Sequence, residues 1–287
     1  MTAAKNNAFV YPRPGAFGAF VAWLVTSPFL LRTRRAVLSR MPFMKLVSDV
    51  HDVVYLNWVV PASAVARYVP PGLTLWERDG TTLFTILTYR HAHFGPALAG
   101  PLRVLFPSPR QSNWRFYVDS MPGATKPDRV ILFVKNILDS VLYVVGSRLF
   151  SDALPSHLAD GFVHEKTSDG YRTVITSGAG SSPTLQCAVR STDSKTLPGD
   201  FSRFFSSWPE AVEFLCLQHS ALAEVEDVER IAHAGIDLPI DLASVQPLTA
   251  ADGAIASEFL EVIGAKGEPL CFVVPEVKFR VMWERLL

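Results

Sequence analysis

The chain has 287 residues, of which 49% are hydrophobic, so it can bury a sizeable core as one large domain or two small ones. Its 27 basic and 27 acidic residues give a formal net charge of zero, and this balance argues against a nucleic-acid partner. Cys187, Cys216 and Cys271 are far apart and lie in apolar strings, which predicts reduced thiols in a reducing compartment rather than a disulfide or a thiolate metal site.

The first hydrophobic segment lies near the N-terminus. Residues 15–31 (GAFGAFVAWLVTSPFLL) carry no charge and are followed directly by Arg32, Arg34 and Arg35. The segment is slightly shorter than the ~20 apolar residues that a membrane-spanning helix needs. A secretory signal peptide has its positive charges before the apolar run, not after it. We therefore interpret residues 1–45 as an N-terminal appendage that contains an apolar helix.

Three placements of this helix stay open. In the first, residues 15–35 lie on a membrane surface with the arginines at the lipid headgroups. In the second, the helix docks on the body of the protein or on a partner subunit of a homo-oligomer. In the third, it forms a short transmembrane anchor. The expected location is the cytoplasm, either free or peripheral to a membrane.

Residues 46–287 have the pattern of one compact domain. Residues 53–60 (VVYLNWVV) are rich in β-branched and aromatic side chains and predict a strand that Pro61 ends. The Asp79-Gly80 pair predicts a tight hairpin turn. Further strands are predicted at residues 73–76, 81–94, 108–120 and 130–135, with one or two closing strands within residues 269–283.

Three helices are expected between or after these strands. A short helix is predicted to end at residue 68, and apolar residues at three- and four-residue spacing predict a second helix at 139–149. A third is predicted to begin at Ser207, because Glu210 has capping-box spacing from it, and to continue toward Leu222. The sequence thus predicts an α+β fold, mostly an antiparallel sheet with a few flanking helices.

The strand at residues 108–120 (SPRQSNWRFYVDS) carries the clearest sign of a binding site. Gln111, Asn113, Arg115 and Tyr117 occupy alternate positions, so they share one face of the strand. Polar groups placed in this way inside a hydrophobic protein predict a face that borders a cavity rather than a packed core.

Three segments resemble a known family. Residues 54–90, QSNWRFYVDS at 111–120 and RLFSDALPSHL at 148–158 resemble, in order and texture, the YqjF-like proteins of unknown function, which are similar to the acetoacetate decarboxylase superfamily. The resemblance covers roughly residues 53–248. It implies a sheet closing into a barrel-like body with a central pocket, often in an oligomer, and thus an acetoacetate decarboxylase-like domain at residues 46–287.

The resemblance also implies a chemistry that this chain cannot share. In the decarboxylase branch a lysine of a Gly-Phe-Pro-Lys-Lys segment forms a Schiff base, and that segment falls near residues 147–155, where this chain has no lysine. A glutamate of the branch falls on the strand that here carries amides and Arg115. We therefore expect no Schiff base and no cofactor. Lys135 and Lys166 remain as nearby amines, and Lys135 is expected to extend to solvent.

Arg115 is the first candidate for a catalytic or ligand-binding residue, since a guanidinium inside a cavity recognises a carboxylate or enolate. The alternative is a structural salt bridge with Asp119 or Asp152. If Arg115 binds a ligand, the side chains of Gln111, Asn113 and Tyr117 would donate hydrogen bonds to a carbonyl oxygen of that ligand. The alternative for these three residues is hydrogen bonding between strand and loop. Tyr89 and Trp114 are expected to line the same cavity as substrate-binding residues.

Two histidines complete the predicted site. His91 and His157 are candidates for general acid or base, because histidine titrates near neutral pH. His91 and His93 share a strand face at a spacing that metal sites use, and His157, His164 or Asp152 could complete such a site. No carboxylate follows at a fixed offset, so we expect no metal.

The predicted function is binding of a small molecule that carries a carbonyl or a carboxylate. If the protein is an enzyme, it polarises the carbonyl and transfers a proton without a Schiff-base lysine. The alternative is a non-catalytic ligand-binding or membrane-peripheral protein that uses the same pocket.

Overall fold

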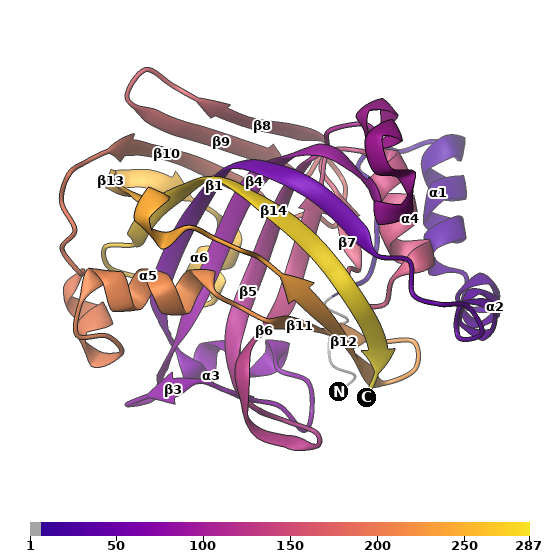
Figure 1. Ribbon diagram of the computed structural model, residues 1–287, viewed down its shortest axis with the longest axis horizontal. Helices are drawn as coiled ribbons and strands as arrows, with labels where there is room; N and C mark the ends of the chain where they lie inside the picture. The colour runs from indigo at the N-terminus through magenta and orange to yellow at the C-terminus, as the bar shows by residue number, and fades with distance from the viewer. Residues whose placement is uncertain (1–6) are drawn as a thin grey trace.

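The fold is taken from a computed structural model, which describes residues 7–287 apart from the side chains of residues 125–128. It is an α+β fold made mostly of strands, as the sequence predicts. All the strands described belong to one hydrogen-bonded sheet, and part of this sheet closes on itself (Figure 1).

The closed part is a ring of seven strands in the order β1, β4, β5, β6, β11, β12, β14 and back to β1. They are β1 (Leu46–Pro61), β4 (Thr81–Pro96), β5 (Arg110–Met121), β6 (Ala124–Leu138), β11 (Ser220–Val225), β12 (Arg230–Asp237) and β14 (Leu270–Leu286). Neighbours run antiparallel except β6 and β11, which are parallel. The strand predicted at residues 53–60 begins earlier, at Leu46, and pairs with β4 on one side and β14 on the other.

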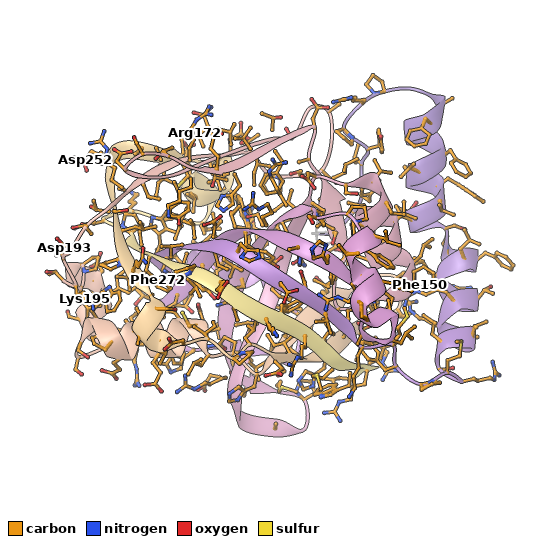
Figure 2. All side chains as sticks on the ribbon, turned by 45° about the horizontal axis from the view of Figure 1, so that its top comes forward. Phe150, Arg172, Asp193, Lys195, Asp252 and Phe272 are labelled. Atoms are coloured by element: carbon orange, nitrogen blue, oxygen red, sulfur yellow. The ribbon has the colours of Figure 1, made fainter. Side chains whose placement is uncertain are left out.

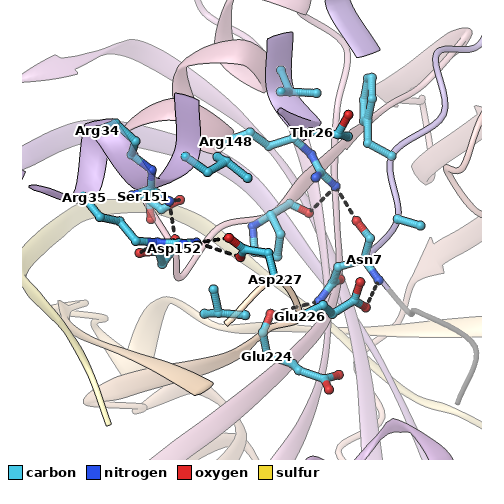
Figure 3. A pocket seen from close by; sticks show the side chains of 16 residues that line it. Asn7, Thr26, Arg34, Arg35, Arg148, Ser151, Asp152, Glu224, Glu226 and Asp227 are labelled. Carbon is cyan, nitrogen blue, oxygen red and sulfur yellow. Dashed lines mark hydrogen bonds and ion pairs between the residues drawn. The ribbon is translucent and has the colours of Figure 1, made fainter. Parts of the chain in front are cut away.

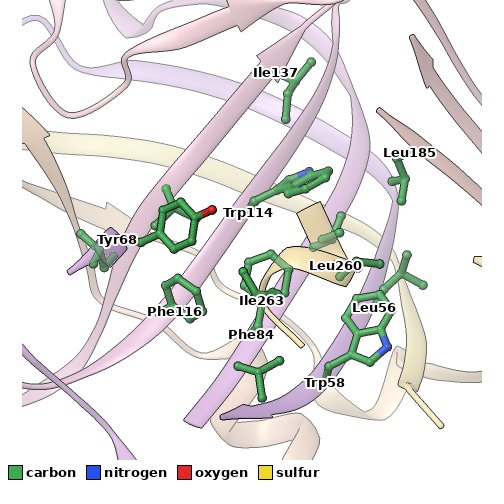
Figure 4. Packing of buried hydrophobic residues seen from close by; sticks show 14 of the residues in the cluster. Leu56, Trp58, Tyr68, Phe84, Trp114, Phe116, Ile137, Leu185, Leu260 and Ile263 are labelled. Carbon is green, nitrogen blue, oxygen red and sulfur yellow. The ribbon is translucent and has the colours of Figure 1, made fainter. Parts of the chain in front are cut away.

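The sheet continues from β14 into a second layer outside the ring. This layer consists of β13 (Gln246–Ala256), β10 (Leu185–Ser191), β9 (Gly170–Thr176) and β8 (Gly161–Lys166). Between the layers lies the largest hydrophobic core, in which Phe84, Trp114 and Phe116 from the ring meet Leu185 from β10 (Figure 4). Helix α6 (Glu258–Val262) adds Leu260 to the same core.

Helix α5 (Trp208–Cys216) packs on the inner face of the ring. It begins where the sequence predicts, because the Ser207 hydroxyl accepts a hydrogen bond from the Glu210 backbone N–H at 3.4 Å. Our expectation that it continues toward Leu222 is wrong. The helix ends at Cys216, and the chain then enters β11 beside β6, where Leu222 is fully buried as a strand residue.

The N-terminal apolar segment forms two helices rather than one. Helix α1 (Ala16–Thr26) and helix α2 (Pro28–Leu38) are bent by 47° at Ser27. Val21 and Val25 of α1 share a small core with Val144 of α4 (Val141–Phe150). Within residues 7–287 no single helix is long and apolar enough to cross a membrane, and α1 and α2 reach that length and composition only as a bent pair.

Short elements complete the fold. They are α3 (Ala62–Val65), β2 (Thr74–Leu75), β3 (Glu77–Arg78), β7 (Ser156–Leu158) and the 3-10 helices η1 (Ala66–Tyr68), η2 (Ala97–Leu105), η3 (Gly199–Arg203) and η4 (Leu242–Ser244). The hairpin predicted at Asp79-Gly80 is confirmed between β3 and β4, with φ of 48° and 72° at these two residues. Positive φ at both central positions is the conformation that Asp-Gly favours in two-residue hairpins.

The close approach of β9 to β10 gives a test of this packing. A Cβ on Gly170 would lie 1.9 Å from the backbone oxygen of Val189, so Gly170→Ala should lower the free energy of unfolding by about 2 kcal/mol or more. The control is Gly146→Ala within α4, where a Cβ meets nothing within 4 Å and a gain of up to about 1 kcal/mol is expected. Denaturant unfolding measures both, and equal effects of the two changes would contradict the predicted strand packing.

Candidate functional site

The polar residues of β5 face the interior of the ring. Gln111, Asn113, Arg115 and Tyr117 are each at most 6% exposed, and strand alternation turns the residues between them toward the outer core. Opposite them, the ring interior is filled mainly by apolar side chains such as Phe133. The interior therefore combines an apolar lining with one stripe of hydrogen-bonding groups.

A chain of hydrogen bonds runs along this stripe. The Gln111 amide nitrogen donates to the Asn113 side-chain oxygen at 2.8 Å, and the Asn113 amide nitrogen donates to the Tyr89 hydroxyl at 2.9 Å. The Gln111 side-chain oxygen thus faces Nε2 of His91 at 2.7 Å, so this nitrogen carries the proton. Nδ1 of His91 then accepts from the Ser48 hydroxyl at 2.7 Å.

His91 is held in its neutral form by this setting. Its side chain is fully buried, and burial lowers its pKa to about 4, against the hydrogen bond to Gln111, which raises it. Both ring nitrogens are engaged with Ser48 and Gln111. In this arrangement His91 orients the Gln111 amide, and its low basicity makes it a poor proton acceptor near neutral pH.

Arg115 is a buried cation without an anion. Its side chain is 2% exposed, and it forms no ion pair with any residue that the structure describes, so neither Asp119 nor Asp152 compensates its charge. One Nη donates to the backbone oxygen of Leu215 at 2.6 Å, and Nε has no partner. An isolated charge inside a protein is costly unless a counter-ion accompanies it.

Two tyrosine rings flank the guanidinium of Arg115. The rings of Tyr55 and Tyr117 are centred 5.6 Å from its central carbon, an arrangement that attracts a cation. Burial raises the pKa of Tyr117, so the phenol keeps its proton and donates to the Thr85 hydroxyl at 2.8 Å. Thr85 in turn donates to the Asn57 side-chain oxygen at 2.7 Å. The two rings therefore offset part of the desolvation free energy of the buried guanidinium but supply no negative charge.

A small cavity of about 20 Å³ borders Gln111 and Asn113 within the ring. Leu154, from the segment that follows α4, and Glu284, near the end of β14, also line it. Burial raises the pKa of Glu284, although its carboxylate accepts hydrogen bonds from the Ser151 hydroxyl at 2.5 Å and the Asp152 backbone N–H at 2.6 Å, which lower it. The cavity has room for about one water-sized group.

Glu284 is the site residue that the sequence did not indicate. It stands in the run WERLL at the end of the chain, where a charged residue between exposed neighbours is ordinary. Only the register of β14 against β12, which pairs Glu284 with Ala234, brings its carboxylate to the cavity. No local pattern could have found it.

Two predicted site residues lie away from Arg115. Trp114 is fully buried on the opposite face of β5, where its indole N–H donates to the Ser112 hydroxyl at 3.0 Å, and so it does not border the cavity. His157 lies outside the ring on β7, with Nδ1 2.7 Å from the Ser181 hydroxyl. Burial lowers the pKa of His157 well below its usual value, and Lys135 and Arg148 lower it further. The fold brings the other predicted residues together inside the ring, namely Tyr89, His91, Gln111, Asn113, Arg115 and Tyr117.

The other predicted ligands of a metal are also separated. His164 bonds the Thr173 hydroxyl at 2.9 Å and the backbone oxygen of Asp52 at 2.8 Å. Asp152 pairs with Arg34 and Arg35 of α2. Among residues 7–287 there is no group of three or more His, Cys, Asp or Glu side chains that could hold a metal ion.

A larger cavity of about 270 Å³ lies outside the ring, between α1, α2, α4 and the turn from β11 to β12 (Figure 3). Its arginines and carboxylates largely neutralise one another, since Arg35 bonds both Asp152 and Asp227. Arg148 donates to the backbone oxygens of Asn7 and Ser156 at 2.8 and 2.6 Å. This cavity contains none of the residues predicted from the sequence for the site, apart from Asp152 as a metal ligand.

Family comparison agrees with this fold. A family model, DUF2071, described as an uncharacterized conserved protein (COG2071), matches residues 48–208. The chain belongs to the DUF2071 family. No curated protein matches the sequence of this DUF2071 member.

The DUF2071 protein also resembles solved structures of the acetoacetate decarboxylase type. An acetoacetate decarboxylase-like enzyme from Sphingomonas wittichii RW1 matches with a TM-score of 0.56 at 11% identity, over 86% of this chain and 94% of that one. The enduracididine biosynthesis enzyme MppR complexed with pyruvate gives a TM-score of 0.52 at 15% identity, over 86% and 91%. A structure of acetoacetate decarboxylase gives 0.51 at 14%, over 86% and 90%. The resemblance inferred from the sequence is confirmed at the level of fold.

Among the residues that the structure describes, no lysine lines the cavity. The segment after α4 that borders it has the sequence SDALP. Lys135 differs from our expectation, because it is half-buried rather than extended to solvent. Burial lowers the pKa of Lys135 to about 8, and Arg148 lowers it further. Lys135 is therefore the most nucleophilic amine of this region, but it does not border the ring cavity.

The buried neutral His91 predicts a loss of stability in acid. An unfolded imidazole titrates near pH 6.5 and the folded one near 4, so between these values the unfolded state takes up a proton that the folded state does not. The free energy of unfolding should therefore fall by about 3 kcal/mol as the pH drops from about 6.5 to 4 on account of this residue. His91→Gln should show a smaller fall in urea titrations across this range. The same pH dependence in wild type and variant would contradict the neutral, buried assignment.

Proposed function

We propose that this DUF2071 protein binds a small carboxylate, of the size and class of a 2-keto acid such as pyruvate, on the inner face of the ring. The observation that carries the proposal is the buried guanidinium of Arg115, which has no anionic partner among the described residues and an unpaired Nε. A carboxylate ligand would supply the missing charge and accept a hydrogen bond from the fork of the guanidinium.

The neighbouring amides suit the carbonyl of such a ligand. Gln111 and Asn113 border the ring cavity, and their orientation is fixed by the hydrogen bonds to His91 and Tyr89. Asn136 stands directly opposite Asn113 in the register of β5 and β6, is 1% exposed, and has no hydrogen-bond partner for either amide atom among the described residues. These groups offer preorganised donors for an oxygen that gains negative charge.

Entry of a ligand requires the interior to open. The cavity of about 20 Å³ is smaller than a keto acid, and Leu154 and Glu284 are among the residues that line it. The segment that contains Leu154 is attached to β14 by the bonds of Ser151 and Asp152 to Glu284. A movement of this segment away from β14 would enlarge the cavity and uncover the polar stripe.

The proposed chemistry is non-covalent. Because no lysine of the described residues borders the cavity, a bound carbonyl would be polarised by the amides and Arg115 without an imine intermediate, and the carboxylate of Glu284, which lines the cavity, would accept the proton of the adjacent carbon. The complex of MppR with pyruvate shows that a neighbour of similar fold takes a ligand of this class. Binding without turnover is the simpler version of the same proposal, and the first experiment concerns binding.

Pyruvate should stabilise the wild-type protein, and the gain should depend on Arg115. At a pyruvate concentration of about one hundred times the Kd, the free energy of unfolding should rise by about 2.7 kcal/mol. Arg115→Gln should abolish this rise, because it removes the counter-ion of the carboxylate. Calorimetric titration and thermal unfolding with and without pyruvate measure the effect.

The matched control is Arg148→Gln, which removes another buried arginine that bonds backbone oxygens outside the ring. It should lower stability yet keep the response to pyruvate. If Arg115→Gln does not fold, Asn113→Leu tests the same stripe without changing a charge. A wild type that ignores pyruvate and related keto acids, or an Arg115→Gln variant that still responds, would refute the proposal.

Borohydride reduction distinguishes this site from a Schiff-base enzyme. Intact mass spectrometry after incubation with pyruvate and borohydride should show no added mass, since no lysine of the described residues lines the ring cavity. The experiment is repeated with Lys135→Ala, which removes the amine whose pKa is lowered to about 8. An adduct on the wild type that disappears in Lys135→Ala would show that covalent chemistry takes place outside the ring.

A further inference from the structure

One end of the molecule exposes large apolar side chains from three segments that are distant in sequence. Figure 1 shows α1, α2 and α4 together at this end, with η2 beside α4. The hydroxyl of Tyr143 in α4 donates to the backbone oxygens of Phe94 and Pro107, at 2.7 and 3.0 Å, and so joins α4 to both flanks of η2. We call this end the helical face.

Helix α1 is apolar on both of its sides. Its inner side packs Val21 and Val25 against α4, whereas Phe17, Phe20 and Trp23 on its outer side are all more than half exposed. A surface helix of a soluble domain normally turns polar residues outward, and a helix that is hydrophobic all round is normally covered. The outer side of α1 is therefore built for a second apolar environment.

The adjoining elements extend the same surface. Phe29 at the start of α2 is 75% exposed, and Leu98 and Leu105 of η2 are 84% and 78% exposed. Phe150 at the end of α4 is 60% exposed and lies at the same end of the molecule in a second view (Figure 2). Exposed apolar side chains that gather at one end of a soluble protein mark an interaction site.

The four elements of the helical face, α1, α2, α4 and η2, contain no Asp or Glu. The sequence has no Asp or Glu from residue 1 to 48, a stretch with seven Lys and Arg residues, and none from residue 80 to 118, which includes η2. Arg32, Arg40 and Lys45 are exposed and form no ion pair among the described residues. An apolar surface with free cations at its margin is complementary to anionic lipid headgroups over an acyl layer.

We propose that the helical face docks on an anionic lipid surface, with α1 in the plane of the interface. Its apolar outer side would lie at the boundary of headgroups and acyl chains, and Arg32, Arg40 and Lys45 would contact the headgroups. Docking in the plane fits the 47° bend between α1 and α2 and the packing of α1 on α4, which leave only one side of the helix for lipid.

A second copy of the chain suits this face less well. In a two-fold interface the same patch meets itself, so the exposed cations of one copy would face those of the other, because the elements of the helical face carry no Asp or Glu of their own. A lipid surface with negative headgroups attracts these cations instead. The proposal does not depend on a ligand inside the ring.

Vesicle sedimentation tests the proposal on the full-length protein. We expect wild type to sediment with phosphatidylcholine vesicles that contain 30% phosphatidylserine, and at least tenfold less with pure phosphatidylcholine or in 0.5 M salt. The double variant Phe20→Ser, Trp23→Ser should lose at least tenfold in binding. The matched control is Val262→Ser in α6, another exposed apolar side chain, which should bind as wild type does.

Two further measurements separate docking from other outcomes. The tryptophan emission should shift to the blue on binding, and Trp23→Phe should remove the shift, because Trp23 is the tryptophan on the outer side of α1. Arg32→Gln, Arg40→Gln and Lys45→Gln together should remove the preference for phosphatidylserine. The proposal would be overturned if the wild-type protein does not sediment with these vesicles, or if the double variant Phe20→Ser, Trp23→Ser sediments to the same extent as wild type. A dimer in ultracentrifugation that the serine variant abolishes, without vesicle binding, would assign the face to a second copy.

Discussion

The pairing of β1 with both β4 and β14 is the constraint on which the rest of the structure depends. It joins residues 46–57 to residues 270–281 and turns an open sheet into a ring. Once the ring is closed, every second side chain of its strands is shut inside, so polar residues there must bond one another or bear the cost of desolvation. The chain from Ser48 through His91, Gln111 and Asn113 to Tyr89 is the result, and Arg115 on the same face of β5 forms no ion pair with any residue that the structure describes.

Local patterns in the sequence were sufficient to predict individual strands, turns and helices, but not the closure of the strands into a ring. The turn at Asp79-Gly80, the start of α5 at Ser207 and the alternation along β5 depend on neighbours within a few residues, and these were predictable. The ring was implied only by family resemblance, since its closing contacts join residues more than two hundred positions apart. Long-range strand pairing also places Glu284 at the cavity, which the local sequence could not predict. For the same reason the sequence did not predict that Trp114 lies on the other face of β5 and His157 on a strand outside the ring, both away from Arg115.

The acetoacetate decarboxylase-like structures share the fold of this chain over most of its length. Among the described residues, the cavity of this protein is lined by the amides of Gln111 and Asn113, the half-buried Glu284 and apolar side chains, with no lysine. The interior of the ring is shielded from water, so the fixed dipoles of its amides act strongly there.

The double role of Asp152 has a consequence for how the two ends of the molecule communicate. Its carboxylate is shared by Arg34 and Arg35 of α2, while its backbone N–H is bound to Glu284 at the edge of the ring cavity. Displacing α2 would therefore leave the buried carboxylate of Asp152 without its two arginine partners, in the segment after α4 that borders the ring cavity. By reciprocity, any change that opens this segment from within would weaken the attachment of α2 by the same free energy. The ring cavity and the N-terminal helices would thus be energetically coupled through Asp152.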